Sequence, residues 1–275
     1  EPVSLDALRT AVPPRSESAP VGEQVSIIVP AYNAGASLET SVSSLLAQTW
    51  SAIEVIIVDD ASTDDTAAIA SDLARRDQRV RVLRQDRNQG PYAARNAGLR
   101  AASGDFITVH DSDDWSHAQK IERQVLALRE NPSARATLSQ WVRVSSDLQF
   151  GTWQTPSGWA GWCHRNTSSL MFRRSVFEQL GYWDRVSCSA DTEYVERIKA
   201  AYGGASILDV ERGVPLALGR MGEQSLTQRP ETSIFSIFTG VRRAYDEGFR
   251  AWHAGASDIS DLYMPEHPAE RPFPV

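Results

Sequence analysis

Three carboxylates fall within four positions of the sequence, directly behind an apolar run. Asp111, Asp113 and Asp114 follow residues 106–109, which have the composition of a buried strand. Carboxylates this close repel one another, and each raises the pKa of its neighbour unless a cation or hydrogen-bond donors hold it. We therefore expect a positively charged partner at this place.

An extended backbone would separate the three acids into two sets. Side chains two positions apart on a strand share a face and lie about 6.6 Å from each other. Asp111 and Asp113 would then face one crevice, and Asp114 would point away as a cap for a helix beginning near Ser116. Two carboxylates on one side suit Mg²⁺ or Mn²⁺, which also take phosphate oxygens of a substrate. Acidic turns after strands are usually only solvated, so this pattern alone is weak.

The elements that must position these acids alternate along the first half of the chain. Near-continuous apolar strands are typical of a parallel sheet buried on both faces. The runs of this kind are residues 25–30, 54–59, 80–83 and 105–111, with helical patterns between them. Such alternation predicts an α/β protein with a doubly wound sheet, whose ligands bind beyond the carboxyl ends of the strands.

Polar residues follow each predicted strand, so they should line one crevice. Tyr32 follows the first strand and can stack on a base, and Asp59 ends the second and can accept a hydrogen bond from a base N–H. Arg95, in the predicted helix after the third strand, is the expected cationic assistant for a diphosphate. Asp60 is expected to serve the turn, and Asn96 and Gly98 could serve only close helix packing.

Composition excludes several classes of protein. The 275 residues carry a formal net charge of -7, which argues against a nucleic-acid partner. Cys163 and Cys188 are too few for a disulfide framework or zinc site. No apolar stretch approaches the roughly 18 residues of a membrane span. The chain begins with Glu1 and shows no leader. We expect a piece of a longer protein with further domains, in the cytoplasm or at the membrane periphery.

These segments, in this order, resemble the family 2 glycosyltransferases of the GT-A fold. The matching pieces of the first half are "VSIIVPAYNAGASLETSVSSLLAQTW", "EVIIVDDASTDDT", "NQGPYAARNAGL" and "GDFITVHDSDDW". The resemblance continues through "SSLMFRRSVFEQLGYWD", "ADTEYVERI" and "PLALGRMGEQSLT", and so covers roughly residues 24–228. It implies a Rossmann-like, mostly parallel sheet flanked by helices, followed by a C-terminal helical extension.

The resemblance also implies an activity and a domain plan. Family members are inverting enzymes that move a sugar from a nucleotide-diphosphate sugar, most often a UDP-sugar, to a carbohydrate or glycoconjugate hydroxyl, as in polysaccharide synthesis. Residues 24–115 would bind the nucleotide sugar and residues 116–228 the acceptor. The proline-rich residues 1–23 would form an irregular arm or linker, and residues 229–275 a helix and a Pro-rich tail.

Site residues follow from the same resemblance. Asp111 and Asp113 would form the DxD pair that holds Mg²⁺ or Mn²⁺, with Asp113 as the direct metal ligand. Pro30, Tyr32 and Asp59 would contact the nucleobase and ribose. The full set assigned to donor binding is Pro30, Tyr32, Asp59, Arg95, Asp111, Ser112 and Arg220.

The resemblance makes Asp191 the general base that deprotonates the acceptor hydroxyl. Arg197 matches the Arg that usually follows in the next helix, but Ala190 replaces the usual Glu before the base. A helix N-terminus keeps a carboxylate ionised, which suits a base. The alternative is that Asp191 caps this helix, with Glu193 and Glu196 as first-turn charges, and the geometry of a helix start would allow both roles at once.

Two further features of the second half bear on the site. Many relatives carry an Arg-x-His segment near the end of the domain, whereas this chain has Arg220 and Gly222. Tryptophans of the second half could stack on acceptor sugars, although each is more simply a core residue. They are Trp141, Trp153, Trp159, Trp162 and Trp183.

Three other classes of protein compete with this interpretation. A non-catalytic carbohydrate- or nucleotide-binding module could keep the same fold, but the chain retains both Asp113 and Asp191. A sugar-1-phosphate nucleotidyltransferase would need a basic, Gly-rich loop after the first strand, where this chain has "VPAYNAG". A dinucleotide-binding dehydrogenase would need GxGxxG at that place.

Overall fold

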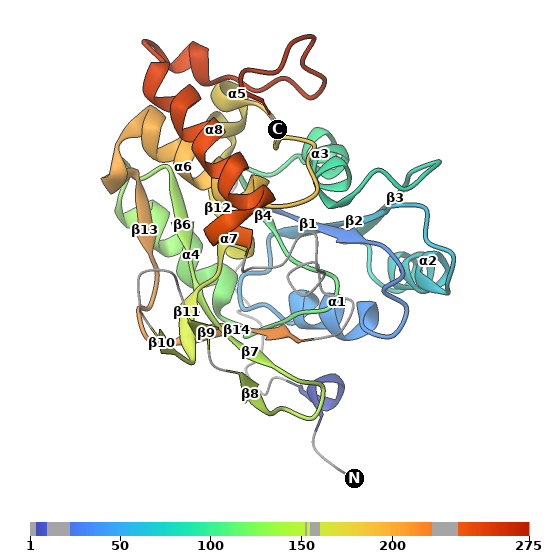
Figure 1. Ribbon diagram of the computed structural model, residues 1–275. Helices are drawn as coiled ribbons and strands as arrows, with labels where there is room; N and C mark the ends of the chain where they lie inside the picture. Colours follow the sequence, from blue (N-terminus) through green and yellow to red (C-terminus); the bar gives the residue numbers. More distant parts are fainter. Residues whose placement is uncertain (1–3, 10–22, 152, 155–159, 222–235, 275) are drawn as a thin grey trace.

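A seven-stranded sheet forms the centre of the protein (Figure 1). The computed structural model describes residues 4–9, 23–151, 153–154, 160–221 and 236–274. The strand order of the sheet is β13-β6-β12-β4-β1-β2-β3. These strands are β1 (Val25–Ala31), β2 (Ile53–Asp59), β3 (Val80–Arg84), β4 (Phe106–Val109), β6 (Ala136–Leu138), β12 (Met171–Arg173) and β13 (Ile207–Asp209).

The four strands predicted from sequence form the parallel half of this sheet. β1 lies between β2 and β4, and β3 pairs with β2, all in parallel. Every residue of β2 and β4 is buried, which is why these runs are apolar without alternation. β12 runs antiparallel to both of its neighbours, β4 and β6. The predicted mostly parallel sheet is confirmed.

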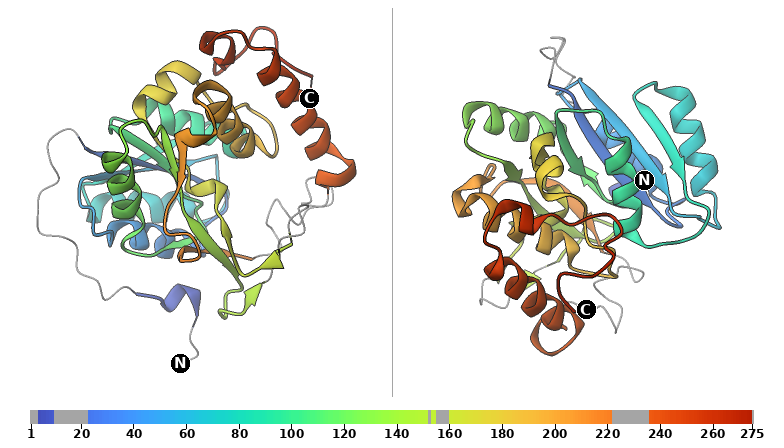
Figure 2. Two further views of the ribbon diagram at one scale, coloured as in Figure 1. Left: turned by 90° about the vertical axis from the view of Figure 1, so that its left-hand side faces the viewer. Right: turned by 90° about the horizontal axis from the view of Figure 1, so that it is seen from above.

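Helices cover both faces of the sheet (Figure 2). One buried apolar cluster joins the sheet to α1, α2 and α4, and a second joins it to α3, α5 and α6. The helices are α1 (Leu38–Leu46), α2 (Thr66–Arg76), α3 (Pro91–Ala101), α4 (Lys120–Glu130), α5 (Arg174–Leu180) and α6 (Ala190–Tyr202). The doubly wound arrangement expected from the sequence is thus observed.

A second, five-stranded sheet lies beside the first and was not predicted. It runs in the order β11-β7-β14-β5, with β8 paired to β7. Its strands are β5 (Trp115–Ser116), β7 (Gln140–Val144), β8 (Phe150–Gly151), β11 (Cys163–Arg165) and β14 (Pro215–Arg220). A separate pair is formed by β9 (Trp153–Gln154) and β10 (Ala160–Gly161). This sheet brings Arg143 and Arg220 to the same end as the acidic turn.

The helix expected to begin near Ser116 begins at Lys120 instead. Ser116 pairs with Ala217 of β14, and its N–H donates to the Ser44 hydroxyl over 3.1 Å. The backbone there is committed to a strand, so it cannot start a helix. Asp114 therefore caps no helix, and its buried carboxylate accepts the backbone N–H of Arg220 over 3.0 Å.

Asn96 and Gly98 fasten α3 to the core, as their packing alternative supposed. The Asn96 amide donates to the Trp183 carbonyl and accepts the Trp183 N–H, at 2.8 and 3.0 Å. A Cβ on Gly98 would lie 2.4 Å from Cγ2 of Ile28, so only glycine allows this approach to β1. Trp183 is 2% exposed and belongs to the core rather than to an acceptor site.

The C-terminal residues pack on the domain. The helix predicted within residues 229–275 is two helices, α7 (Ser236–Thr239) and α8 (Val241–Gly255), while residues 229–235 lie outside the described residues. Tyr245 and Phe249 of α8 are buried with Met264 and Phe273, and Figure 1 shows α8 beside α6.

The N-terminal residues that the structure describes dock on the second sheet. The turn η1 (Leu5–Ala7) buries Leu5 against Val142 and Val144. The Leu5 N–H donates to the Ser146 carbonyl over 2.9 Å. The expected irregular arm is therefore anchored at this point.

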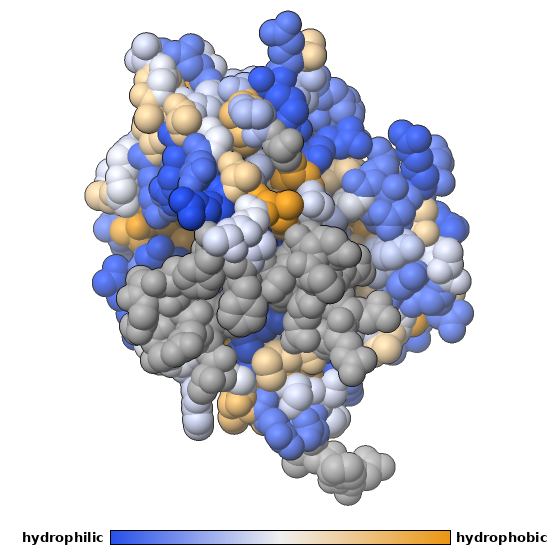
Figure 3. Space-filling view, in the orientation of Figure 1, coloured by the Kyte–Doolittle hydropathy of each residue, from blue (hydrophilic) through white to orange (hydrophobic). Residues whose placement is uncertain are grey.

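The described surface is largely hydrophilic on the face shown in Figure 3, where hydrophobic side chains form small separate patches. Among the helices that the structure describes, none has the length and apolar character to cross a membrane.

Candidate active site

An open cavity of about 1420 Å³ lies at the carboxyl ends of β1 and β4. Its walls come from these strand ends, α3, the second sheet, the first turn of α6 and one side of α8. Segments far apart in the sequence thus meet where the parallel sheet predicted a ligand. The predicted site residues that line the cavity are Pro30, Tyr32, Arg95, Asp111, Ser112, Asp113, Asp191 and Arg220.

Asp59 is the predicted site residue that the cavity lining omits. Its side chain is fully buried, Oδ1 accepts the Ser62 N–H over 3.0 Å, and Oδ2 lies 3.4 Å from Nε of Arg84. The Asp59 side chain thus serves its own loop, and its expected contact to a nucleobase stays a prediction. Asp60 lines the cavity and accepts the N–H groups of Gln89 and Gly90, as expected for a turn residue.

Residues 111–114 form a turn rather than the extended segment that we expected. The Asp114 N–H donates to the Asp111 carbonyl over 3.2 Å and closes this turn. β4 ends at Val109 and β5 begins at Trp115, so the chain must reverse in the few residues between them. Asp111, Asp113 and Asp114 all line the cavity, but Asp114 is 5% exposed and serves to hold β14.

Arginine side chains provide part of the positive charge that we expected beside the carboxylates of this turn. Arg95 pairs with Asp111 at 2.9 Å. Burial and repulsion from Asp111 raise the pKa of Asp113 to about 6, although Arg143 and Arg220 oppose this rise. The same two causes, burial and neighbouring carboxylates, raise the pKa of Asp114 well above its ordinary value. The turn thus holds more negative charge than its surroundings favour.

Lys120 and His110 lie buried behind the turn. Burial lowers the pKa of Lys120 to about 8, while Asp114 and Asp111 oppose this change. Burial and the charge of Lys120 lower the pKa of His110 well below its ordinary value. A neutral His110 ring can donate from Nδ1 to the Asp111 carbonyl at 2.9 Å and accept the Ser116 hydroxyl at Nε2 at 2.8 Å. His110 is therefore a scaffold for the turn.

The carboxylate oxygens of the acidic turn are suitable ligands for a hard divalent cation. Asp111 and Asp113 offer carboxylate oxygens to the same cavity. Within the described ranges, no group of three or more His, Cys, Asp or Glu residues could hold a metal ion. A cation here would thus take one or two carboxylates and fill its shell with water or phosphate oxygens, as Mg²⁺ commonly does. Gly222, at the position of the relatives' His, lies outside the described residues.

Arg143 is a site residue that the sequence analysis missed. It lies on β7, is 8% exposed and lines the cavity. Its guanidinium donates to the Arg220 carbonyl over 3.1 Å and lies 4.9 Å from the centre of the Trp141 ring. The alternation of residues 140–144 could have indicated a strand, but only the second sheet brings this arginine to Asp113.

Arg220 reaches the cavity but is already paired in this structure. Its Nη1 donates to the Asp6 carboxylate over 3.2 Å, and its Nε donates to the Asp113 carbonyl over 3.0 Å. The N-terminal segment thus holds the arginine that was expected to bind a diphosphate.

Asp191 lies in the first turn of α6 and faces the cavity. Ser189 is the N-cap of this helix, so the capping alternative for Asp191 is wrong. Its Oδ1 accepts the Tyr92 hydroxyl at 3.0 Å and the Thr192 N–H at 2.9 Å. Its Oδ2 accepts the Thr167 hydroxyl at 3.2 Å.

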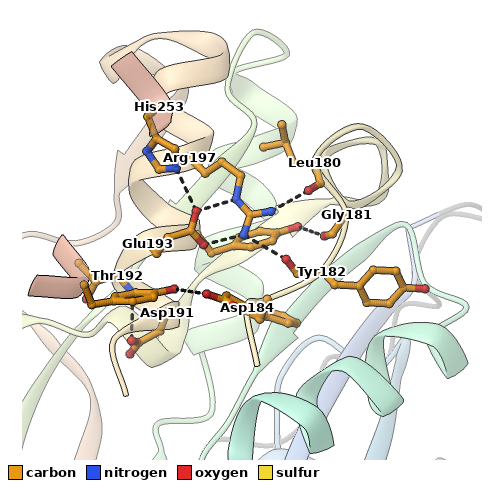
Figure 4. A network of polar contacts seen from close by, with 12 residues as sticks. Leu180, Gly181, Tyr182, Asp184, Asp191, Thr192, Glu193, Arg197 and His253 are labelled. Atoms are coloured by element: carbon orange, nitrogen blue, oxygen red, sulfur yellow. Dashed lines mark hydrogen bonds and ion pairs between the residues drawn. The ribbon is translucent and has the colours of Figure 1, made fainter. Parts of the chain in front are cut away.

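Behind Asp191, a buried ion pair fixes α6 (Figure 4). Arg197 and Glu193 are both fully buried and lie 2.6 Å apart. Arg197 also donates to the carbonyls of Leu180 and Tyr182. Burial opposes ionisation of Glu193, but Arg197 and a hydrogen bond from His253 outweigh it and hold the Glu193 pKa below its ordinary value. Arg197 does not line the cavity and instead anchors the helix that carries Asp191.

The fold and this cavity define an α/β protein whose ligand site lies at the carboxyl ends of parallel strands. The family model described as glycosyl transferase family 2 matches residues 26–188. The chain therefore belongs to this family, as the sequence motifs predicted.

Curated relatives match over part of their length. The chain is 43% identical over 107 residues to an uncharacterized glycosyltransferase of Haemophilus influenzae, covering 39% of this chain and 43% of that protein. It is 40% identical over 113 residues to the succinoglycan biosynthesis protein ExoO of Rhizobium meliloti, covering 41% of this chain and 31% of ExoO. The chain thus spans less than half of each of these relatives.

Solved structures match the fold more completely. The S. aureus TarS 1-349 structure in complex with UDP-GlcNAc aligns with a TM-score of 0.59 at 21% identity, covering 74% of this chain and 60% of that chain. The complex with UDP gives 0.58 at 19% identity, covering 73% and 61%. At this identity the likeness shows the fold alone. It confirms the GT-A type of α/β fold.

Proposed function

We propose that this chain is the catalytic part of an inverting glycosyltransferase that uses a nucleotide-diphosphate sugar. The observation that carries this proposal is one cavity lined both by Asp111 and Asp113 and by Asp191. Such a cavity offers a place for a diphosphate-bound cation and for a base in the same space. Membership of family 2 supports glycosyl transfer as the reaction.

The donor would lie along the ends of β1 and β4. Tyr32 is 48% exposed and can stack on a base, while Arg95, Arg143 and Arg220 can bind phosphate oxygens. We propose a UDP-sugar, because the structural neighbour TarS was crystallised with UDP and with UDP-GlcNAc. Asp111 and Asp113 would hold Mg²⁺ or Mn²⁺, which neutralises charge on a leaving diphosphate when it is bound.

Asp191 would act on the acceptor. The acceptor O–H bond breaks and its proton moves to the Asp191 carboxylate. The oxygen's electron pair forms the bond to the anomeric carbon, and the bond from that carbon to the diphosphate oxygen breaks with its pair. We propose a carbohydrate or glycoconjugate acceptor, which would meet the Trp141 side chain in the cavity wall.

A biological setting follows as part of the same proposal. Similarity to ExoO, a succinoglycan biosynthesis protein, supports a role in polysaccharide synthesis. The free thiols of Cys163 and Cys188 suit a reducing compartment, so we place the chain in the cytoplasm or at the cytoplasmic membrane surface.

Asp113→Asn should weaken metal-dependent donor binding. Loss of one charged ligand is expected to raise the Mn²⁺-dependent Kd of a UDP-sugar by about tenfold or more, since contacts to charged groups are worth about 1.5–3 kcal/mol. Calorimetric titrations with and without Mn²⁺ measure this change. Asp147→Asn, on an exposed turn between β7 and β8, is the matched control. An unaltered response to Mn²⁺ in Asp113→Asn would count against its role as a ligand.

Asp6→Asn should have the opposite sign of effect. It removes the carboxylate that holds Arg220 but leaves Leu5 to anchor the segment. Because partly exposed ion pairs are worth at most about 1 kcal/mol, UDP-sugar binding should tighten by up to about fivefold. The same titration checks it. Weaker binding in Asp6→Asn would show that the ion pair supports the donor site instead of competing with it.

A further inference from the structure

The Asp191 carboxylate is held by three hydrogen-bond donors. Tyr92 and the Thr192 N–H both donate to Oδ1 of Asp191, and Thr167 donates to Oδ2. A carboxylate offers about four lone-pair positions, two on each oxygen. Among the contacts of the described residues, Oδ1 is therefore filled, and Oδ2 keeps one position for an acceptor proton.

Tyr92 contacts the donor side of the cavity with its ring. The Arg95 guanidinium lies 5.0 Å from the centre of that ring, and Arg95 pairs with Asp111 at 2.9 Å. Tyr92 and Arg95 are three positions apart on α3 and share one face of the helix. Each is 6% exposed. Tyr92 and Arg95 thus link Asp191 to the acidic turn at residues 111–114 along one face of α3.

We propose that Tyr92 is a positioning residue for glycosyl transfer, which holds Asp191 in place relative to the donor diphosphate. Its hydroxyl binds the Asp191 carboxylate, and its ring lies beside Arg95. The inference rests on the proposed role of Asp191 as the base. α3 can serve as the fixed support because Asn96 and Gly98 fasten it to the core. Burial and the neighbouring charge of Asp191 raise the pKa of Tyr92 well above its ordinary value, so its hydroxyl stays protonated and donates.

Tyr92→Phe separates the two contacts, because it removes the hydroxyl and keeps the ring beside Arg95. We expect kcat for transfer to fall about tenfold to a hundredfold, as for the loss of a hydrogen bond to a charged group. The Kd of the UDP-sugar should stay within about twofold. The acidic limb of the pH–kcat profile should move to higher pH, because a carboxylate that loses a donor is protonated more readily.

Two companion variants make the test specific. Tyr245→Phe removes a buried hydroxyl that donates to Asp184 over 3.1 Å and lies outside the cavity lining, so it reports the structural cost of losing a Tyr–Asp bond. It should leave the pH–kcat profile unchanged. Tyr92→Leu also removes the ring beside Arg95, and it should weaken UDP-sugar binding in addition to lowering kcat.

The outcomes separate this inference from the proposed function. If the wild-type chain transfers sugar and Tyr92→Phe matches Tyr245→Phe in kcat and in its pH profile, the positioning role is overturned. A fall in kcat with an unmoved acidic limb also overturns it. A wild-type chain that binds and turns over no UDP-, GDP- or dTDP-sugar overturns the proposed function itself, and the role of Asp191 with it.

Discussion

Asp191→Asn should abolish sugar transfer while leaving the donor bound. The amide has the shape of the carboxylate: its oxygen can still accept the Tyr92 hydroxyl, and its N–H can donate to the Thr167 hydroxyl. It cannot take a proton from an acceptor. General-base catalysis contributes about 10²–10⁴ in rate, so kcat should fall by at least this factor. Steady-state transfer assays give kcat, and calorimetry with a UDP-sugar should give a Kd within about twofold of wild type.

Asp72→Asn on α2 is the matched control for this variant. Asp72 pairs with arginines of its own helix, away from the cavity lining, and its loss should leave transfer unchanged. Unchanged transfer in Asp191→Asn itself would place the base at another residue.

Arg197→Met should lower the free energy of unfolding by about 3–5 kcal/mol, because it leaves the Glu193 carboxylate buried without its charged partner. The carbonyls of Leu180 and Tyr182 also lose a donor. Urea denaturation followed by circular dichroism measures the change. The ion pair in Figure 4 holds the helix that carries Asp191, so we expect α6 to be the first element that is destabilised.

Lys199→Met offers the comparison on the same helix. Lys199 pairs with Glu196 at 2.6 Å but is 28% exposed, so its loss should cost at most about 1 kcal/mol. The double variant Glu193→Leu with Arg197→Met removes both buried charges and should be more stable than Arg197→Met alone. Equal losses in Arg197→Met and Lys199→Met would contradict the structural role of the buried pair.

Much of the parallel half of the fold could be predicted from local pattern. The runs of β1, β2 and β4 are apolar because both faces are buried, and this signal lies in adjacent residues. Their carboxyl ends must meet, so Tyr32 and Asp111 could be placed in one site from the sequence alone. Family motifs then added Asp191 and Arg220, which local pattern alone does not connect.

Local sequence pattern is insufficient where one residue or one distant contact decides the outcome. Asp59 and Asp60 differ by a single position, and only the backbone of the loop shows that Asp60 faces the cavity. The turn at residues 111–114 depends on β5, which pairs with β14 about a hundred positions later in the chain. The Tyr92–Asp191 bond joins residues 99 positions apart, and in the sequence Tyr92 reads as an ordinary core aromatic of a helix.

Donor turnover tests directly whether this chain uses a nucleotide-diphosphate sugar. UDP-, GDP- and dTDP-sugars are incubated with the wild-type chain, with and without Mn²⁺, and release of the nucleoside diphosphate is followed together with donor binding. We predict that at least one donor, most directly a UDP-sugar, is bound and hydrolysed, and that Mn²⁺ increases both. No binding and no hydrolysis of any of these donors, with or without Mn²⁺, would show that the chain is not a nucleotide-sugar-dependent glycosyltransferase.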